Sequence, residues 1–337
     1  METVTAEPAV YRTASREYVA DSCEPVREAA EAGRIHLVAA GRGSYPGRRL
    51  PGRRLPELRS VGVWDAAERQ DWGLDWHRNE GLEIAFLGAG RLTFELAGTA
   101  HLLRPGDLTI TRPWQRHRVG DPYVTPSRLS WLILDLGVRR PNQPWAWPDW
   151  LLLDRASIRR LTQLLRETDR PVWRADAATE LAFERLPRSL EGPEISFPLL
   201  TLAVNEILVA LLEMLDREQP TLDRKLTSSE HTVEVFLDTL ADHVNEPWTL
   251  ESMAAACGVA RTRFTHHCKA ITNTTPTVFL RRARVARAAA LLEARPDLSV
   301  TEICFASGFS SSQYFATVFK QERNISPSDY RSRQVAR

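Results

Sequence analysis

The chain has 337 residues, of which 43% are apolar and 26% are charged. These values are typical of a globular protein, and at ~100–200 residues per domain the length predicts two or three domains. Lysine and arginine number 44 against 43 aspartate and glutamate residues, so the net charge of +1 indicates no polyanionic partner for the chain as a whole. The segment 257–337 differs, because it has thirteen basic and five acidic residues. This basic region at one end predicts a polyanionic partner there.

The sequence predicts no secretory signal, no membrane span and no cysteine-based zinc or C-x-x-C site. Residues 1–22 are polar and lack the apolar run of a secretory signal, so we expect a cytoplasmic protein. The apolar stretch 197–215 is interrupted by Asn205, Glu206 and Glu213, which excludes a membrane span and indicates a buried or dimer-forming helix. The four cysteines show neither a C-x-x-C pair nor zinc spacing, and we expect them to act as small apolar residues.

The residue pattern of the first part of the chain changes twice, near residues 59 and 150. Residues 1–58 are expected to be irregular, and the tandem repeat PGRRLPGRRL (46–55) is predicted to be a solvated, mobile loop. Over 59–149, short strand-like runs separated by Gly-Ala-Gly, Ala-Gly-Thr and Pro-Gly-Asp predict a β-sandwich or small barrel. After the Pro- and Trp-rich connector, helical periodicity predicts a helical dimerisation region over 150–222.

The last part of the chain is predicted to be entirely helical. A polar, non-periodic stretch places an interdomain linker at 223–228, and the helical domain follows over 229–337. Its first helix is capped by Ser228 or Ser229 and stops at Pro247. The apolar positions of this helix are Val233, Phe236, Leu237, Leu240 and Val244.

A helix-turn-helix pattern occupies residues 249–271. Thr249 is a candidate N-cap, and Gly258 stands where the first helix must end with positive φ, with Val259 at the corner. The residues expected to face inward are Met253, Ala254, Ala256, Phe264 and Cys268. The outward face of the second helix carries Arg261, Thr262, Thr265, His266 and Lys269, a polar and basic surface suited to DNA.

The same pattern recurs over residues 300–321, with Gly308 at the turn and Phe309 at the corner. Ile303, Ala306, Phe315 and Phe319 are expected to face inward, and Ser312, Gln313, Ala316, Thr317 and Lys320 outward. An unbroken helix over 276–292 joins the two patterns and would be roughly 25 Å long. A rigid connector of that length can place two recognition helices in successive major-groove segments, which lie ~34 Å apart.

These residues resemble the AraC/XylS family of bacterial transcription regulators. The similarity lies in A-x-x-C-G-V-A-R-T-R-F (254–264), R-x-x-x-A-x-x-L-L (284–292) and I-x-x-x-x-G-F-x-S-x-x-Y-F-x-x-x-F-K (303–320), followed by Ser326-Pro327 and Tyr330-Arg331. The resemblance implies a sequence-specific regulator that binds double-stranded DNA in the major groove and, if it is an activator, contacts RNA polymerase. The apolar helix over 197–215 predicts a homodimer.

The resemblance also implies which residues read base edges. These positions are Thr262, Thr265 and His266 in the first unit and Ser312, Gln313, Ala316 and Thr317 in the second. Gln313 can bridge adenine N6 and N7, and His266 can donate to guanine. Ala316 offers only a methyl group, so we expect the second unit to add more affinity than specificity. Arg261, Arg263, Lys269 and Lys320 suit phosphates. For the connector's Arg281, Arg282, Arg284 and Arg287, DNA contact and a solvated or domain-facing role both stay open.

The β region is similar, more weakly, to the cupin motifs. Metal-binding cupins use two histidines spaced by one residue, a glutamate and a distant histidine; here Asp75 replaces the first histidine, and His77, Glu83 and His117 follow. These three residues match a facial triad suited to iron. Regulators of this plan instead favour a metal-free effector pocket, so no metal or other cofactor is predicted. The expected pocket residues are Trp76, His77, Glu83, Arg91, His117 and Trp131, which suit a carbohydrate or aromatic effector.

Taken together, the sequence predicts an α+β protein. An N-terminal cupin-like β-barrel with a helical dimerisation region precedes an all-α domain in which a long helix joins two helix-turn-helix units. The expected function is transcription regulation in response to a small-molecule effector, without enzymatic activity. Two alternatives stay open: a cupin metalloenzyme with an accessory helical domain, and a ligand-independent regulator whose barrel only dimerises the chain.

Overall fold

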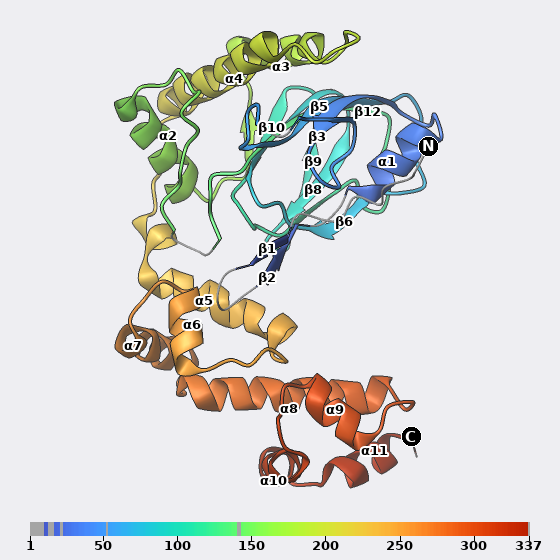
Figure 1. The fold of residues 1–337 in the computed structure, drawn as a ribbon, viewed down its shortest axis with the longest axis vertical. Coiled ribbons are helices and arrows are strands. Elements are labelled where there is room, and N and C mark those ends of the chain that lie inside the picture. Colours follow the sequence, from blue (N-terminus) through green and yellow to red (C-terminus); the bar gives the residue numbers. More distant parts are fainter. Residues whose placement is uncertain (1–9, 13–16, 21–22, 52, 140–142, 336–337) are drawn as a thin grey trace. The chain divides into compact units, whose positions relative to one another are not determined.

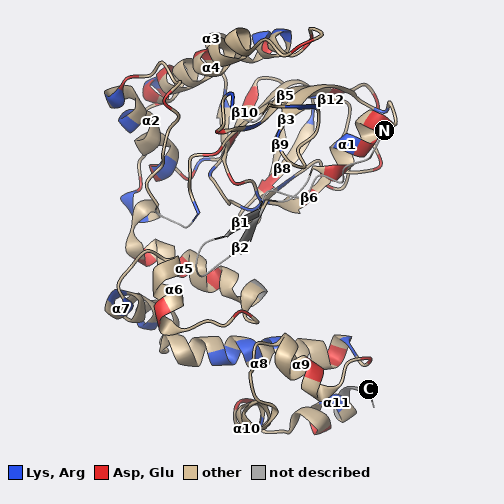
Figure 2. Cartoon of the chain, viewed as in Figure 1, with Lys and Arg blue, Asp and Glu red and all other residues tan. Residues whose placement is uncertain are grey.

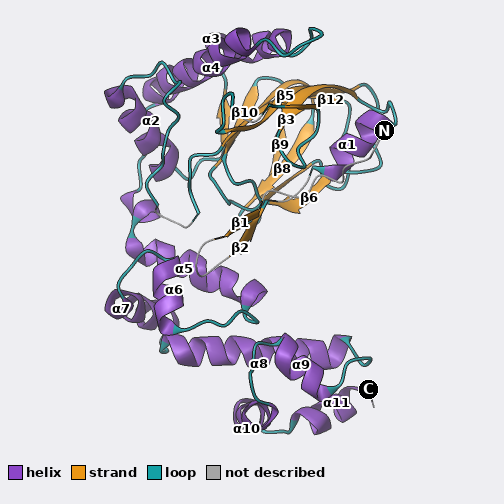
Figure 3. Ribbon diagram, in the orientation of Figure 1, coloured by secondary structure: helices purple, strands orange, loops and turns teal. Residues whose placement is uncertain are grey.

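The computed structural model describes residues 10–12, 17–20, 23–51, 53–139 and 143–335. The chain divides into two compact units near residue 226. The described residues up to 226 form the sheet unit, and those from 227 onward form the helix unit. Figure 1 labels their elements, and Figure 3 shows that all strands lie in the first unit. The predicted division into a strand-rich N-terminal part and a helical C-terminal part is confirmed.

Two antiparallel sheets form the centre of the sheet unit. The larger has seven strands in the order β13 (Val172–Arg174), β10 (Asp107–Thr111), β7 (Leu82–Gly90), β12 (Ser127–Leu134), β5 (Leu58–Ala66), β3 (His36–Gly41) and β4 (Arg48–Arg49), of which only β3 and β4 pair in parallel. The smaller has four strands in the order β6 (Leu74–His77), β11 (His117–Val119), β8 (Leu92–Leu96) and β9 (Thr99–Leu103). Strands β1 (Val10–Arg12) and β2 (Glu17–Val19) form a separate pair.

The larger sheet is buried on both faces. Successive side chains of a strand point to opposite faces, and β7 shows the result: Ile84 and Phe86 lie in one hydrophobic core, and Ala85 and Leu87 lie in another. The second core is shared with the smaller sheet, for example with Phe94. A strand covered on both faces reads as a continuous apolar run, which is the pattern of β7 and β12.

Helices cover the other face of the larger sheet (Figure 1). They are α2 (Arg155–Glu167), α3 (Ala177–Arg185) with the 3-10 turn η1 (Leu186–Ser189), and α4 (Phe197–Glu218), while α1 (Glu24–Glu31) packs in the second core. The predicted separate region 150–222 therefore shares a core with the sheet, and it also supplies strand β13 to the sheet edge.

Helix α4 is long and apolar enough to pass a length-and-composition test for a membrane span, but most of that stretch is buried inside the unit. Its inward side chains include Leu200, Val204 and Leu208. The buried Asn205 accepts a hydrogen bond from the amide of Leu152 and donates one to the carbonyl of Thr201, so its polar groups are satisfied. The predicted buried helix is confirmed.

The segment before residue 59 is more ordered than predicted. It contains α1, β3 and β4, and the repeat at 46–55 packs against the unit. Leu50 and Leu55 are buried in the first core, and the guanidinium of Arg48 donates to the carbonyls of Leu190, Gly192 and Pro193. The prediction of a solvated loop is therefore wrong for the buried Pro46, Leu50 and Leu55, whereas Arg49, Pro51, Arg53 and Arg54 are exposed; residue 52 lies outside the described residues.

The helix unit consists of helices joined by short turns. After the 3-10 turn η2 (Arg224–Thr227), the elements are α5 (Ser229–Thr239), η3 (Leu240–His243), α6 (Leu250–Ala256), α7 (Arg261–Thr272), α8 (Pro276–Ala294), α9 (Val300–Ala306), α10 (Ser312–Arg323) and α11 (Pro327–Val335). Ser228 caps α5 as predicted, but α5 ends at Thr239, ahead of Pro247.

Candidate nucleic-acid interface and buried polar cluster

The first helix-turn-helix unit consists of α6, the turn at Gly258 and α7. Thr249 caps α6 in a capping box with Ser252, as its position predicted. Gly258 has φ of 65°, a left-handed conformation that glycine adopts without a Cβ penalty. The predicted inward residues are all buried: Met253, Ala254, Ala256, Phe264 and Cys268.

The second helix-turn-helix unit consists of α9, the turn at Gly308 and α10. Ser299 caps α9 in a capping box with Glu302, and Gly308 has φ of 83°. Ile303, Phe309, Phe315 and Phe319 are buried in a core of their own. Ala306 is exposed, so its predicted inward position is wrong; the turn is closed instead by the buried Ser307 that follows it.

The predicted base-reading residues lie on the open faces of α7 and α10. Thr262, His266, Ser312, Gln313, Ala316 and Thr317 are exposed, and Thr265 is half-buried. Both helices begin with their first turn uncovered, which is the part that reaches base edges when a recognition helix enters the major groove. Neither face is packed against its own unit, as DNA reading requires.

The predicted phosphate-binding residues Arg261, Arg263, Lys269 and Lys320 are also exposed. Arg261 forms an ion pair with Glu251, with 2.6 Å between Nη1 and Oε1, and its hydrogen bond lowers the pKa of the Glu251 carboxyl. Both side chains are more than 60% exposed. A pair this exposed is weak, so a phosphate can displace Glu251 from Arg261.

Helix α8 joins the two units and is part of both cores. Its nineteen residues, at ~1.5 Å each, give a rod of roughly 28 Å. Leu280 packs in the core of the first unit, whereas Val285, Ala288 and Leu292 pack in the core of the second. Figure 2 shows basic residues along this helix and on α7.

The connector's arginines divide by their contacts. Arg284 donates from Nε to the carbonyl of Val244 at 2.9 Å and from Nη2 to the carbonyl of Glu246 at 2.8 Å. Arg281 pairs with Glu322 on α10 at 2.9 Å. These two residues therefore face the protein. Of the two roles left open by the sequence, DNA contact or a solvated or domain-facing position, they have the domain-facing one. Arg282 and Arg287 are exposed, although Arg282 also approaches Glu322.

Gly308 also links the two helix-turn-helix units. A Cβ placed on it would stand 2.3 Å from the carbonyl oxygen of Val244 and 2.9 Å from the Cα of Asn245. The turn of the second unit therefore lies directly on the segment that precedes α6 in the first. With Arg284 bonded to the same Val244 carbonyl, the two units meet in a small interface that admits no side chain at position 308.

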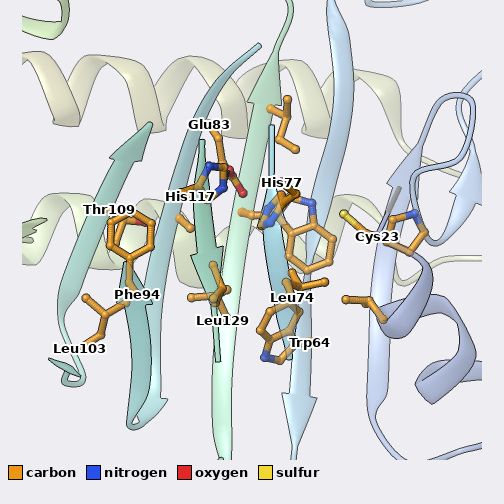
Figure 4. Close-up of a pocket in the computed structure, with 16 residues that line it drawn as sticks. Cys23, Trp64, Leu74, His77, Glu83, Phe94, Leu103, Thr109, His117 and Leu129 are labelled. Carbon is orange, nitrogen blue, oxygen red and sulfur yellow. Dashed lines mark ion pairs between the residues drawn. The ribbon is translucent and has the colours of Figure 1, made fainter. Parts of the chain in front are cut away.

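The sheet unit contains a mainly apolar cavity between its two sheets (Figure 4). Of the predicted pocket residues, His77, Glu83, His117 and Trp131 line it. Trp76 and Arg91 do not, and their assignment is wrong. Trp76 stacks with Arg116 and Arg118 outside the cavity, because neighbours on a strand point to opposite faces. Arg91 is exposed between β7 and β8.

Most of the apolar wall of the cavity was not predicted from the sequence, including Trp64, Leu74, Phe94 and Leu129. Trp64 packs against Trp131, with ring centroids 5.9 Å apart. The missed signal was the alternation on β8, where Leu92, Phe94 and Leu96 are buried and the residues between them are not. The indole N–H of Trp131 donates to Ser60, so this residue offers the cavity an apolar surface.

Three polar side chains converge at one end of the cavity. His77 on β6 and His117 on β11 are directly paired in register, and their ring centroids are 4.2 Å apart. Glu83 reaches them from β7 in the other sheet, with 2.9 Å between its Oε2 and His117 Nε2. Figure 4 shows the three side chains together.

Burial and contact shift the acid–base properties of this cluster. Burial, together with the neighbouring His117 ring, lowers the pKa of His77 to about 4, so its imidazole is neutral at pH 7. Burial alone would raise the pKa of Glu83, but its contacts with His117, His77 and Thr111 lower it overall. The cluster therefore combines a carboxylate with imidazole nitrogens in a largely apolar surrounding.

Known proteins match different shares of the chain. A family model described as a helix-turn-helix domain matches residues 253–333. The HTH-type transcriptional activator RhaS of Escherichia coli O139:H28 is 30% identical over 159 residues, which cover 47% of this chain and 56% of the activator. The chain thus spans about half the length of the curated relatives it matches.

Two solved structures illustrate the likeness. The DNA-binding domain of AdpA in complex with a target DNA is 28% identical, with a TM-score of 0.30 over 31% of this chain and 93% of that one. ToxT from Vibrio cholerae is 11% identical, with a TM-score of 0.34 over 82% of this chain and 97% of that one.

The fold and the matched residues define the helix unit as a double helix-turn-helix DNA-binding domain. The helix-turn-helix match over residues 253–333 and the similarity to RhaS support the resemblance to AraC-type transcription regulators that the motifs of this part indicated.

Proposed function

We propose that the chain is a sequence-specific DNA-binding transcription regulator. The observation that carries the proposal is the pair of exposed recognition faces, on α7 and α10, whose units share one connecting helix. A rod of roughly 28 Å can hold two such faces near the ~34 Å spacing of successive major-groove segments. The 30% identity over 159 residues to an HTH-type transcriptional activator supports a role in transcription regulation.

Within this role, the exposed side chains divide into two groups. His266 and Gln313 carry base-edge donors and acceptors, and Thr262, Thr265, Ser312 and Thr317 supply hydroxyl or methyl contacts. Lys269, Lys320, Arg261 and Arg263 supply positive charge to phosphates, which fixes position without reading sequence. Ala316 offers only a methyl group, so it can contact the methyl of thymine but makes no hydrogen bond to a base edge.

We further propose that the sheet unit is the sensor. A ligand bound there alters DNA affinity only as far as it binds one arrangement of the chain more tightly than another. The cavity measures about 30 Å³, and one water needs ~10–15 Å³. A sugar or aromatic ring is larger than this space, so such an effector requires the cavity side chains to move apart.

We also propose that the chain forms a homodimer and acts in the cytoplasm. If the regulator is an activator, RNA polymerase is a further partner. Helix α4 exposes Leu199, Leu202 and Val209 although its other side is buried in the core. This exposed strip is the candidate dimer surface. Sedimentation of the wild-type chain and of Leu202→Glu tests it, because a charge in a self-complementary apolar contact favours the monomer.

The central experiment is capture of genomic DNA fragments by the purified chain, followed by binding curves on the captured sequences. We expect a few related sequences to be retained over random DNA at physiological salt, and a His266→Ala plus Gln313→Ala double variant to lose that preference. An exposed residue of the sheet unit, Arg155→Ala, is the matched control. Equal retention of all fragments by the wild-type chain would overturn the proposal.

A further inference from the structure

We infer that a groove on the sheet unit binds the phosphate group of a small phosphate ester. The groove is lined by residues of the repeat at 46–55 and of the segment that leads into helix α4, and its volume is about 550 Å³. Small-molecule sites occupy ~300–1,000 Å³, whereas the cavity between the two sheets measures about 30 Å³. The inference concerns the sheet unit alone and does not depend on DNA binding.

The backbone of the repeat is held in place, so its arginine side chains extend from fixed positions. Strand β4 pairs with β3 at the edge of the larger sheet, and Leu50 and Leu55 are buried in the core. The guanidinium group of Arg42 also donates to the carbonyls of Arg54 and Leu55. A surface whose backbone is already ordered loses less entropy when a ligand binds.

The opposite wall of the groove is tied to the same repeat. Arg48 donates from Nη1 to the carbonyl of Gly192 and from Nη2 to the carbonyl of Pro193, both at 2.7 Å. The amide of Ser196 donates to the carbonyl of Ser189 at 2.9 Å, which holds the start of α4 as well. Arg48 is therefore a positioning residue, and the neighbouring arginines are left to contact the ligand.

Arg49 and Arg54 provide the positive charge that faces the groove. Both line it and are exposed, and no carboxylate among the described residues lies within ion-pair distance of either guanidinium group. Glu194 is the acidic residue of the described lining, against three arginines, so the lining has a net positive charge. A guanidinium group offers paired N–H donors that match phosphate oxygens. The charge of the groove thus favours an anion with several oxygens.

The start of α4 adds partial positive charge at the same place. Ser196 is the N-cap of this helix, and its side chain makes no capping hydrogen bond. The first-turn N–H groups therefore have no side-chain acceptor from their own cap. The helix end contributes less to anion binding than the two exposed guanidinium groups, because it has only a fraction of a unit charge.

Apolar side chains offer a surface to the organic part of the ligand. Ile195 and Phe197 line the groove and are half-buried. The guanidinium carbon of Arg54 lies 5.3 Å from the centre of the Phe197 ring, so positive charge and a flat apolar surface are adjacent. A sugar or base can pack on such a surface while its phosphate contacts the arginines. A phosphate ester therefore fits the groove better than an inorganic ion, which would leave the apolar surface uncovered.

The test is isothermal titration calorimetry of the tag-free, full-length chain in low-salt, magnesium-free buffer. Glucose 6-phosphate and AMP are the phosphate esters, inorganic phosphate is the bare ion, and adenosine lacks phosphate. We expect at least one ester to bind with a dissociation constant below about 1 mM, more tightly than inorganic phosphate or adenosine and less tightly as salt is added.

Two results of the titration would overturn the inference. Binding of neither ester in the millimolar range would show that the groove is not a phosphate site. Inorganic phosphate or adenosine bound as tightly as the esters would contradict the assignment to a phosphate ester, because the charged and the apolar surfaces would then not act on one ligand.

Substitutions locate the ligand. Arg49→Ala and Arg54→Ala should each lower the affinity roughly fivefold or more, whereas Glu194→Gln should raise it, because a repelling carboxylate is removed. Arg155→Ala removes an exposed arginine elsewhere on the sheet unit and should leave the affinity unchanged. Circular dichroism identifies any variant that does not fold. Unchanged ester binding in the folded Arg49→Ala and Arg54→Ala variants contradicts the inference.

Duplex DNA is the alternative partner of these arginines. We expect Arg49→Ala and Arg54→Ala to bind DNA as the wild-type chain does. Loss of DNA affinity together with unchanged ester binding would assign the arginines to the DNA backbone and overturn the inference. Ester binding by a chain that binds no specific DNA would instead contradict the proposed regulator role and leave this site standing, so the two failures are distinguishable.

Discussion

The first helix-turn-helix unit and the second are built from elements of equal length. Helices α6 and α9 have seven residues each, and α7 and α10 have twelve each. Both recognition helices end at an asparagine in the left-handed region, Asn273 and Asn324. Their surfaces differ, because α7 carries Arg261, Arg263 and Lys269, whereas the same face of α10 is mostly neutral.

Their turns differ as well. Gly258 is exposed, whereas Gly308 is pressed onto the backbone of Val244 and Asn245. The same arrangement of helices therefore has a different role in each helix-turn-helix unit. The first unit offers more positive charge to DNA, and the second is fixed in place by its turn and by Arg284. The chemistry of the reading face and the anchoring of the unit are thus set by separate residues.

The largest expected effect comes from adding one methyl group at the second turn. Gly308→Ala forces a Cβ into the Val244 carbonyl and into a positive-φ backbone, and we expect a loss of about 3 kcal/mol in the free energy of unfolding of the helix unit. Gly258→Ala places a side chain in the same left-handed backbone region, which costs about 1–2 kcal/mol. Hydrogen exchange of α9 and α10 in the full chain measures both. Equal losses would show that the turn does not anchor the unit.

Removal of the Arg284 side chain should have the next largest effect on the free energy of unfolding. Arg284→Ala leaves the carbonyls of Val244 and Glu246 without this donor, and we expect it to cost about 2 kcal/mol. The looser connection should also make DNA binding less sensitive to one inserted base pair between the two contacted segments. Affinities on matched and lengthened operators measure this. Arg287→Ala, on the same helix but exposed, is the control and should keep the wild-type sensitivity.

The recognition faces can be compared directly by two substitutions. Gln313→Ala should relax preference at one base pair, near the lower end of ~1–3 kcal/mol, because a bidentate base contact is lost. Lys269→Ala should weaken binding to all sequences alike and reduce the salt dependence by about one phosphate contact. Binding curves on an operator series at several salt concentrations separate the two patterns. Uniform loss from both variants would contradict this division of the contacts.

The smallest expected effect concerns the ion pair on the first unit. Glu251→Gln frees Arg261 from its partner, so binding to any DNA should strengthen by less than about tenfold at low salt and hardly at all at high salt. Fluorescence anisotropy at two salt concentrations detects this. Glu302→Gln, one position further along α9 than the equivalent of Glu251, removes no arginine partner among the described contacts and should leave the affinity nearly unchanged.

Local features of the fold were predictable from the sequence. Caps at Ser228 and Thr249, turns at Gly258 and Gly308, and the apolar periodicity of the helices depend on neighbouring residues alone. The structure has these features, except that Ala306 is exposed and α5 ends at Thr239. The contact between Gly308 and Val244 joins residues 64 positions apart. Nothing in either local sequence marks it, because it depends on how two cores pack around α8.

The sheet unit was less predictable for the same reason. Helical periodicity identified α2 and α4, but it could not show that they cover the sheet or that β13 returns to its edge. At the cavity, His77, Glu83 and His117 were found by their chemistry. Trp76 lies outside it because the pairing of β6 with β11 is irregular between Leu74 and His77, both of which line the cavity. The apolar wall is formed by residues with no chemical signature, and only the pairing of strands brings them together.

The return of β13 to the edge of the seven-stranded sheet has a practical consequence for dissecting the protein. A fragment ending at residue 139 would lack that edge strand and the helices α2, α3 and α4, and would leave Ile84, Phe86 and Leu132 uncovered. Such a fragment is expected to aggregate on expression, since an open sheet edge beside a bare apolar face recruits other chains. The smallest well-behaved sensor fragment should instead extend to about residue 226.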